Sequence, residues 1–341
     1  MELKIAKNED SETWNNIVEN SPQGTIFHTW KWLKIAEKHT NSRLYPIIGY
    51  RGTEPVGIYP LFLIKKKGIR LVFSPPPKAL LLYLGPAFTN FQKLKQSRRE
   101  TLFTEFQAAV DEFIRSELRG NYTRIRTPPG LLDSRPLKWC GYEVEPLYTY
   151  FIDLSKGIDF VWSNLNRKLR VGIEKTRREG VSVEIGDKED LEFLRISLYS
   201  RFEEQGLKPQ KEYYRSYLSD LYNAFYPQNM KVFIAKLHEE RVGGLVVLCY
   251  KNWSALWIGI PKTNLKGIYP NDLAQWEAIR WACEQGFRYY EEMDAGDDPR
   301  LRHFKAKYNP ELVPWYSAVK YSSFLFKGLE KSVKFVGKFR R

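Results

Sequence analysis

The sequence predicts an α/β (α+β) protein in which one unit, a mixed twisted sheet flanked by helices, occurs twice. Residues 44–64 and 232–250 each have the pattern of a β-hairpin, because two strand-like apolar runs flank a short polar turn. In both halves a further strand, a long helical stretch and another short strand follow in the same order. The length of 341 residues suits two domains of this kind.

We expect the first domain to span residues 1–150 and the second to span residues 151–318. Beside its hairpin, the first domain is predicted to contain helices within 13–39, strands at 70–73, 79–84 and 122–126, and a helix over 98–118. The second is predicted to contain a strand over 254–260, a helix over 271–285 and a strand over 287–293. Residue identity between the halves is weak, so a chance similarity of two α/β domains stays open.

The composition excludes several classes of protein. The longest apolar run, residues 79–84, is too short to span a membrane, and the N-terminus has no signal-peptide pattern, so we expect a cytoplasmic protein. The three cysteines and four histidines have no metal-ligand spacing, so no metal is expected. The net charge of +14 favours an anionic partner such as RNA, a nucleotide-linked substrate or an acidic membrane surface.

One concentration of positive charge begins the second domain. Residues 153–180 have helical periodicity, with an apolar stripe on one side and basic residues on the other. Arg167 and Arg170 lie one turn apart, which suits contact with a phosphate-bearing acceptor or a tRNA backbone. The alternative is an ordinary solvated helix face.

A second concentration of positive charge lies in residues 319–341, which we treat as a separate tail. Basic residues alternate there with Phe, Leu and Val, which predicts a basic amphipathic helix on an anionic membrane surface or on RNA. The tail thus leaves open a peripheral contact with the inner face of the membrane. A partly disordered tail is the alternative.

Short motifs occur in order along nearly the whole chain. They are Phe27-His-Thr-Trp-Lys-Trp-Leu33, Leu84-Gly-Pro86, the basic segment 165–181, Gly267-Ile-Tyr-Pro-Asn-Asp272 and Leu301-Arg-His-Phe-Lys305. Together they resemble the Fem peptidyltransferase and BioF/CelD-like acetyltransferase family, which has two GNAT-like domains in tandem. The resemblance implies transfer of an acyl or aminoacyl group to an amine, from an acyl-CoA thioester or an aminoacyl-tRNA.

The resemblance also implies catalytic residues. Attack of an amine on a carbonyl produces a tetrahedral oxyanion, which needs hydrogen-bond donors or a cation. Lys305 matches the family's Phe-Lys segment and is the first candidate for this role, although an exposed lysine on a packed helix is the alternative. Asp272, at the expected N-cap of the long helix, and Asp294, after a strand, are candidate general bases, with simple capping as the alternative for Asp272.

The remaining candidates are expected to bind substrates. His28 and Trp30 resemble residues of the family's acceptor cleft, and Phe304 would pack against a base or an acyl chain. The full set of substrate-binding candidates is His28, Trp30, Arg167, Arg170, Tyr269 and Phe304. The donor pyrophosphate is expected on Lys262, Lys266 and Gly267, before the long helix.

Two donors are compatible with these residues. An aminoacyl-tRNA would explain the positive charge and a donor loop with only one glycine, Gly267. An acyl-CoA would explain why residues 209–226 form only one short aromatic helical stretch rather than a long coiled-coil insertion. We prefer a CoA-dependent N-acyltransferase acting on an amine of an anionic cell-envelope, sugar-nucleotide or lipid precursor. The alternatives are a Fem-like, aminoacyl-tRNA-dependent peptidyltransferase and a non-catalytic module that binds RNA or a membrane.

Overall fold

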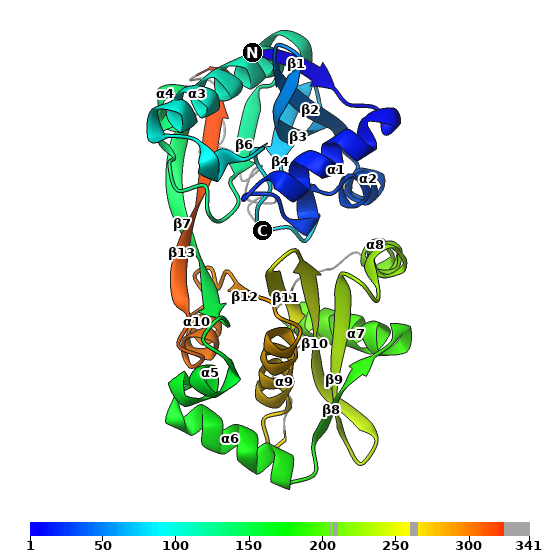
Figure 1. Ribbon diagram of the computed structural model, residues 1–341. Helices are drawn as coiled ribbons and strands as arrows, with labels where there is room; N and C mark the ends of the chain where they lie inside the picture. Colours follow the sequence, from blue (N-terminus) through cyan, green and yellow to red (C-terminus); the bar gives the residue numbers. More distant parts are fainter. Residues whose placement is uncertain (205, 207–210, 260–264, 324–341) are drawn as a thin grey trace. The chain divides into compact units, whose positions relative to one another are not determined.

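The computed structural model describes residues 1–204, 206, 211–259 and 265–323, and the chain divides into two compact units (Figure 1). The first unit contains Met1–Tyr148 and Pro314–Arg341, and the second contains Thr149–Val313. The chain passes from the first unit to the second within β7 (Glu143–Asp153) and returns within β13 (Glu311–Tyr321). Whereas the sequence predicts boundaries at 150 and 318, the chain re-enters the first unit at 314, because β13 pairs with a strand of that unit.

The first unit has a mixed sheet in the order β1-β2-β3-β4-β6-β13, and the short β5 pairs with β3. Its strands are β1 (Glu2–Ile5), β2 (Arg43–Arg51), β3 (Glu54–Lys66), β4 (Ile69–Ser74), β5 (Ala87–Phe88) and β6 (Tyr122–Arg126). Its helices are α1 (Ser11–Asn20), α2 (Trp30–His39), α3 (Gln96–Phe113) and α4 (Arg135–Trp139). The predicted hairpin is confirmed as β2 and β3, which pair in an antiparallel manner.

Helix α3 packs tightly on one face of this sheet. Phe106 of α3 is fully buried, and its ring fills the space that a side chain at Gly49 or Gly57 would need. A Cβ atom at Gly49 would lie 2.7 Å from this ring. The two glycines on β2 and β3 therefore allow the helix to approach the sheet closely.

The second unit has a mixed sheet in the order β7-β12-β11-β10-β9-β8. Its further strands are β8 (Ser182–Gly186), β9 (Met230–Leu237), β10 (Glu240–Tyr250), β11 (Trp253–Gly259) and β12 (Tyr289–Met293). Its helices are α5 (Ile158–Asn164), α6 (Arg167–Arg178), α7 (Lys188–Glu204), α8 (Lys211–Phe225), α9 (Pro270–Glu284) and α10 (Pro299–Ala306).

Helices α9 and α7 cover opposite faces of this second sheet. A Cβ atom at Gly243 would meet Asn271 and Pro270 at the start of α9, whereas one at Gly244 would meet Leu194 of α7. Neighbouring residues of a strand point to opposite faces, so the sheet lies between the two helices. Figure 1 shows α9 and α7 in these positions beside β10.

The two units repeat one order of elements, as the sequence predicts. In the first unit, the hairpin β2-β3 is followed by β4, α3 and β6, and β4 pairs with β6 in parallel. In the second, the hairpin β9-β10 is followed by β11, α9 and β12, and β11 pairs with β12 in parallel. The predicted α/β fold with two similar units is therefore confirmed.

Three local predictions need correction or lie outside the described residues. Residues 79–84 are not a strand: the segment is irregular after the prolines at 75–77, and Leu80 has a φ of 52°. Residues 153–180 form two helices rather than one, because the side chain of Asn166 caps a new helix by accepting from the Lys168 amide. Of the tail 319–341, the first three residues end β13, and residues 324–341 lie outside the described residues.

Helix α6 has the amphipathic character that the sequence predicts. Leu169, Ile173 and Thr176 are buried, whereas Arg167 and Val171 are exposed. Ile173 belongs to a core cluster that includes Leu273 and Trp276 of α9, so α6 is fixed beside that helix. In the described parts of the chain, no helix has the length and apolar character that crossing a membrane requires.

The two sides of α6 provide a matched test of this packing. Ile173→Ala should lower the free energy of unfolding by about 2–5 kcal/mol, because it leaves a cavity in the core of the second unit. Val171→Ala, on the exposed side of the same helix, should change it by less than about 0.5 kcal/mol. Urea unfolding followed by circular dichroism measures both, and equal losses would contradict the described orientation of α6.

Candidate active site at the end of strand β12

Strand β12 carries three consecutive buried polar residues, Tyr290, Glu291 and Glu292. Because side chains alternate along a strand, Tyr290 and Glu292 point to one face of the sheet and Glu291 points to the other. Glu291 accepts hydrogen bonds from Thr149 Oγ1 at 2.5 Å and from Trp253 Nε1 at 2.8 Å. Its carboxylate thus joins β12 to the neighbouring strands β7 and β11.

Lys305 of α10 binds the end of β12. Its ammonium donates to the backbone carbonyl oxygens of Glu292, of Met293 at 3.0 Å and of Asp294 at 2.9 Å. The side chain is buried, with 5% of the residue exposed. An ammonium group has three N–H donors, so these three carbonyl groups match its full capacity. Lys305 therefore fixes the backbone where Met293, at a φ of 60°, turns the chain out of the sheet.

The carboxyl group of Glu292 is subject to the positive charge of this ammonium. The Nε2 group of Gln275 of α9 donates to Glu292 Oε1, and the other carboxyl oxygen, Oε2, has no hydrogen-bond partner among the residues that the structure describes. Complete burial raises the pKa of Glu292 to about 8, although the positive charge of Lys305 and the Gln275 donor act in the opposite direction. Burial also lowers the pKa of Lys305, and Glu292 partly offsets that effect. Near neutral pH, the structure thus favours a protonated Glu292 beside a charged Lys305.

The two predicted general bases have different surroundings. Asp272 is the third residue of α9 and not its N-cap, because the helix begins at Pro270 and the N-cap position is Tyr269. Its carboxylate forms an ion pair with Lys307 Nζ at 2.6 Å. Asp294 is half-buried just after β12, and its Oδ1 accepts from the amide of Gly296 at 2.7 Å.

Phe304 is half-buried beside the same group of residues. Its ring centroid lies 5.8 Å from that of Tyr308, and Lys307 Nζ lies 4.3 Å from its ring centroid. Tyr308 is buried and donates its hydroxyl to the carbonyl oxygen of Asp272 at 3.3 Å. Helix α10 and the residues after it therefore connect the start of α9 to the end of β12.

The loop before α9 is held against the basic helix α6. The amide of Tyr269 donates to Thr176 Oγ1 at 2.9 Å. Gly267 has a φ of 75°, and Lys175 Nζ lies 2.8 Å from the position that a Cβ atom of Gly267 would occupy. A side chain at this position would therefore displace the lysine. Tyr269 itself is 42% exposed.

The other predicted phosphate-binding residues lie in or near this loop. Lys266 is exposed beside Gly267, and Lys262 lies outside the described residues. On α6, Arg167 is exposed and Arg170 is half-buried, with its Nε atom buried and lacking a hydrogen-bond partner among the described residues. The structure thus brings Lys175 of α6 to Gly267, the residue that follows Lys266.

His28 and Trp30 belong to the first unit and have local partners there. Nδ1 of the buried His28 accepts from the amide of Thr25 at 3.2 Å, and Nε2 lies 3.0 Å from the carbonyl oxygen of Leu84. The neutral ring with a proton on Nε2 satisfies both contacts. The ring of Trp30 is half-buried and packs edge to face on Trp14, with centroids 5.8 Å apart.

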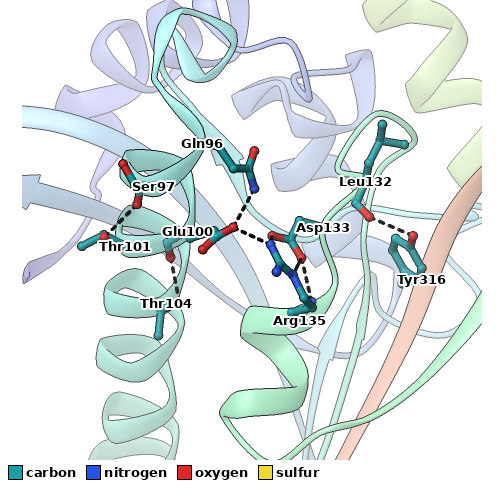
Figure 2. Close-up of polar contacts among 9 residues, drawn as sticks. All are labelled: Gln96, Ser97, Glu100, Thr101, Thr104, Leu132, Asp133, Arg135 and Tyr316. Atoms are coloured by element: carbon teal, nitrogen blue, oxygen red, sulfur yellow. Dashed lines mark hydrogen bonds and ion pairs between the residues drawn. The ribbon is translucent and has the colours of Figure 1, made fainter.

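A polar cluster of the first unit surrounds Arg135 (Figure 2). The guanidinium binds both oxygens of Asp133, at 2.9 and 2.8 Å, and also Glu100 of α3 at 2.5 Å. These opposite charges satisfy one another, and the nearby Tyr316 hydroxyl donates to the carbonyl oxygen of Leu132 at 2.9 Å. The cluster therefore has a structural role, holding α4 against the start of α3.

Sequence reasoning missed several residues of the second unit. The candidates did not include Glu292, Gln275 or Lys175. One signal for Glu292 was present in the sequence, because two adjacent acidic residues, Glu291 and Glu292, are unusual in a strand that is expected to be buried. Only the packing of α9 and α10 against β12 distinguishes the buried Glu292 from an ordinary surface carboxylate. No cluster of His, Cys, Asp and Glu that could hold a metal ion occurs within the described ranges.

Comparisons with known proteins identify the domain that contains these residues. Residues 163–305 match the family model described as an acetyltransferase (GNAT) domain. A search of curated proteins found no match. The matched segment includes α6, the loop before α9, β12 and Lys305.

Solved structures show that the fold extends over nearly the whole chain. FemX is similar with a TM-score of 0.70 and 15% identity, over 93% of this chain and 97% of FemX. A tandem GNAT protein from the clavulanic acid biosynthesis pathway has a TM-score of 0.55 and 10% identity, over 94% and 99%. L-PGS from Bacillus licheniformis has a TM-score of 0.53 and 16% identity, over 98% and 99%.

The buried carboxyl of Glu292 should make stability depend on pH. In the unfolded chain this group ionises near pH 4.5, but in the folded protein it keeps its proton to about pH 8. Between these values the folded state holds the additional proton, so stability falls as pH rises, by up to about 1.4 kcal/mol per pH unit. Glu292→Gln, which resembles the protonated form, should remove this part of the decline.

Urea unfolding at pH 5, 6.5 and 8 measures this effect. Glu179→Gln provides the control, because Glu179 is an exposed carboxyl at the end of α6. The control should follow the wild-type dependence on pH, whereas the advantage of Glu292→Gln should grow from pH 5 to pH 8. A constant difference between Glu292→Gln and the wild type would show that Glu292 ionises normally.

Proposed function

We propose that the part of the chain that matches the acetyltransferase (GNAT) domain model, residues 163–305, transfers an acyl group from a CoA thioester to an amine. The observation that carries the proposal is the match of this domain to the part of the chain that holds Lys305, Asp294 and the loop before α9. We propose an amine of an anionic cell-envelope, sugar-nucleotide or lipid precursor as the acceptor. The net charge of +14 supports an anionic substrate.

The residues around Gly267 suit the phosphates of such a donor. Gly267 has a positive φ, which disfavours other residues there, and Lys175 Nζ occupies the space beside it, so a cation lies close to the backbone of this loop. Lys266 adds a second exposed cation, and α9 directs the positive end of its dipole toward this loop. We propose that Lys175, Lys266 and Gly267 bind the donor phosphates, together with Lys262.

The proposed reaction assigns different roles to the charged residues after β12. Asp294 takes a proton from the attacking ammonium, and the resulting amine forms a bond to the donor carbonyl carbon. The buried positive charge of Lys305 stabilises the oxyanion. The carbon–sulfur bond then breaks, and the thiolate leaves with a proton from the new amide nitrogen. Asp272 is a weaker candidate for the base, because it is paired with Lys307.

A second candidate donor is an aminoacyl-tRNA. The specific observation in its favour is the exposed basic surface of α6, formed by Arg167, Lys168, Lys175, Arg177 and Arg178. The fold likeness to FemX and to L-PGS is consistent with this alternative but does not distinguish the donors. Arg167 and Arg170 would then contact the tRNA backbone, and Tyr269 and Phe304, which belong to the same unit, would bind the acceptor or the acyl group.

Donor binding distinguishes the two candidates. Calorimetric titration with acetyl-CoA, a long-chain acyl-CoA and charged tRNA, each at two salt concentrations, should show micromolar CoA binding that persists in salt. Gly267→Leu should weaken that binding at least tenfold, because its side chain would displace Lys175. Gly286→Leu, at a positive φ beyond the end of α9 and open to solvent, controls for backbone strain.

Two results would overturn the preference for CoA. Binding of tRNA that depends on its aminoacyl group, without binding of CoA, would establish the aminoacyl-tRNA donor. Salt-sensitive binding of RNA regardless of aminoacylation, with no transfer to any amine, would instead indicate a non-catalytic module.

Replacing Lys305 should affect turnover more than substrate binding. Lys305→Met removes the buried charge, and kcat should fall about 10²–10³-fold with little change in KM. Loss of the three carbonyl contacts should also lower stability, so unfolding must be measured alongside activity.

Two further variants make this result interpretable. Lys188→Met removes an exposed lysine at the start of α7 and should keep wild-type kinetics. Lys305→Arg retains the charge and should recover part of kcat if the charge is what matters. A folded Lys305→Met protein with wild-type kcat would eliminate Lys305 from the mechanism.

A further inference from the structure

Two polar atoms on the same face of β12 are buried without hydrogen-bond partners. They are the hydroxyl of Tyr290 and Oε2 of Glu292, which find no partner within the part of the chain that the structure describes, and both residues are completely buried. A buried polar group without a partner costs free energy, so its presence in a folded protein calls for a physical reason. The proposed transfer reaction uses neither residue.

The Lys305 ammonium contacts the backbone of Glu292 and acts electrostatically on its carboxyl group. The ammonium donates a hydrogen bond to the backbone carbonyl oxygen of Glu292. The carboxyl group of interest is the side chain of this same residue. The ammonium also donates to the backbone carbonyl groups of Met293 and Asp294, and both of these acceptors are uncharged. A carboxylate is a stronger acceptor for an ammonium than a neutral carbonyl group. Ionisation of Glu292 would therefore favour movement of the Lys305 ammonium toward Oε2.

We propose that Glu292 is a positioning residue for the acyl-transfer site and that its protonation keeps Lys305 bound to the three carbonyl groups at the end of β12. When Glu292 loses its proton, the ammonium forms a direct ion pair with the carboxylate and releases the carbonyl groups of Met293 and Asp294. The backbone leaving β12 then loses the contacts that hold Asp294. Loss of the proton from Glu292 thereby makes the backbone of the proposed site less ordered and lowers its activity.

The neutral groups beside Glu292 do not change charge in the pH range in which it ionises. Gln275 is neutral, and the burial that raises the pKa of Tyr290 and Tyr308 keeps both protonated where Glu292 ionises. The titratable and charged groups of the elements packed around Glu292 are Tyr290, Glu291 and Asp294 from β12 and its end, Asp272 from α9, and Lys305, Lys307 and Tyr308 from α10 and the turn after it.

This inference rests on the proposed transfer reaction, and a pH–rate profile tests it there. In the wild type, kcat should decline above about pH 8 and fall about tenfold per pH unit, as expected for loss of one essential proton. Glu292→Gln should be active at neutral pH and should lack this decline. Glu284→Gln, an exposed carboxyl at the end of α9, should keep the wild-type profile.

A second variant shifts the transition instead of removing it. Gln275→Met keeps the length of the side chain but removes the donor that lowers the pKa of Glu292. The decline in kcat should therefore begin at a higher pH than in the wild type. A profile that is the same in the wild type, Glu292→Gln and Gln275→Met would overturn the proposal.

Hydrogen exchange of the full-length protein tests the same change without any substrate. After correction for the intrinsic effect of pH, the backbone amides of residues 293–296 should lose protection between pH 7 and pH 9 in the wild type and keep it in Glu292→Gln. If exchange shows this change but no donor supports transfer, the proposed reaction is wrong and the switch stands. If protection is equal in both proteins at pH 9, the switch is wrong whatever the reaction.

Discussion

The contact between the Lys305 ammonium and the end of β12 is the interaction on which the candidate site depends. A lysine is rarely buried, because removing its charge from water costs several kcal/mol unless hydrogen-bond acceptors in the protein satisfy its three N–H groups. Here three backbone carbonyl oxygens, on three consecutive residues, provide the match. The same contact fixes the direction in which the chain leaves the sheet, and therefore the position of Asp294.

This arrangement explains why so many polar residues gather in the core of the second unit. Burying Lys305 places a positive charge beside Glu292, and Gln275 supplies a neutral donor that does not add a second charge. Asp272 and Lys307 form their own ion pair at the start of α9. The charges are thus placed in pairs or against backbone dipoles, which suits the proposed role of this site in stabilising a developing negative charge.

Elements with a strong local pattern could be predicted from the sequence, whereas elements that depend on distant partners could not. The hairpins, α9 and β12 have apolar runs and turn residues close together, and their prediction is confirmed. Strands β7 and β13 were missed because their partners lie far away in sequence, as with Ser317 and Arg126. Likewise, Lys305 and Asp294 could be named from motifs, but the importance of Glu292 follows only from packing that buries it.

The central claim is that the second unit binds the acyl donor between the loop before α9 and the end of β12. Hydrogen exchange with and without saturating acyl-CoA tests it most directly, because it locates binding without assuming a reaction. The account predicts donor-dependent protection of residues 265–275 and 290–296. Protection restricted to the first unit, at the start of α3 around Gln96 and Glu100, would contradict it.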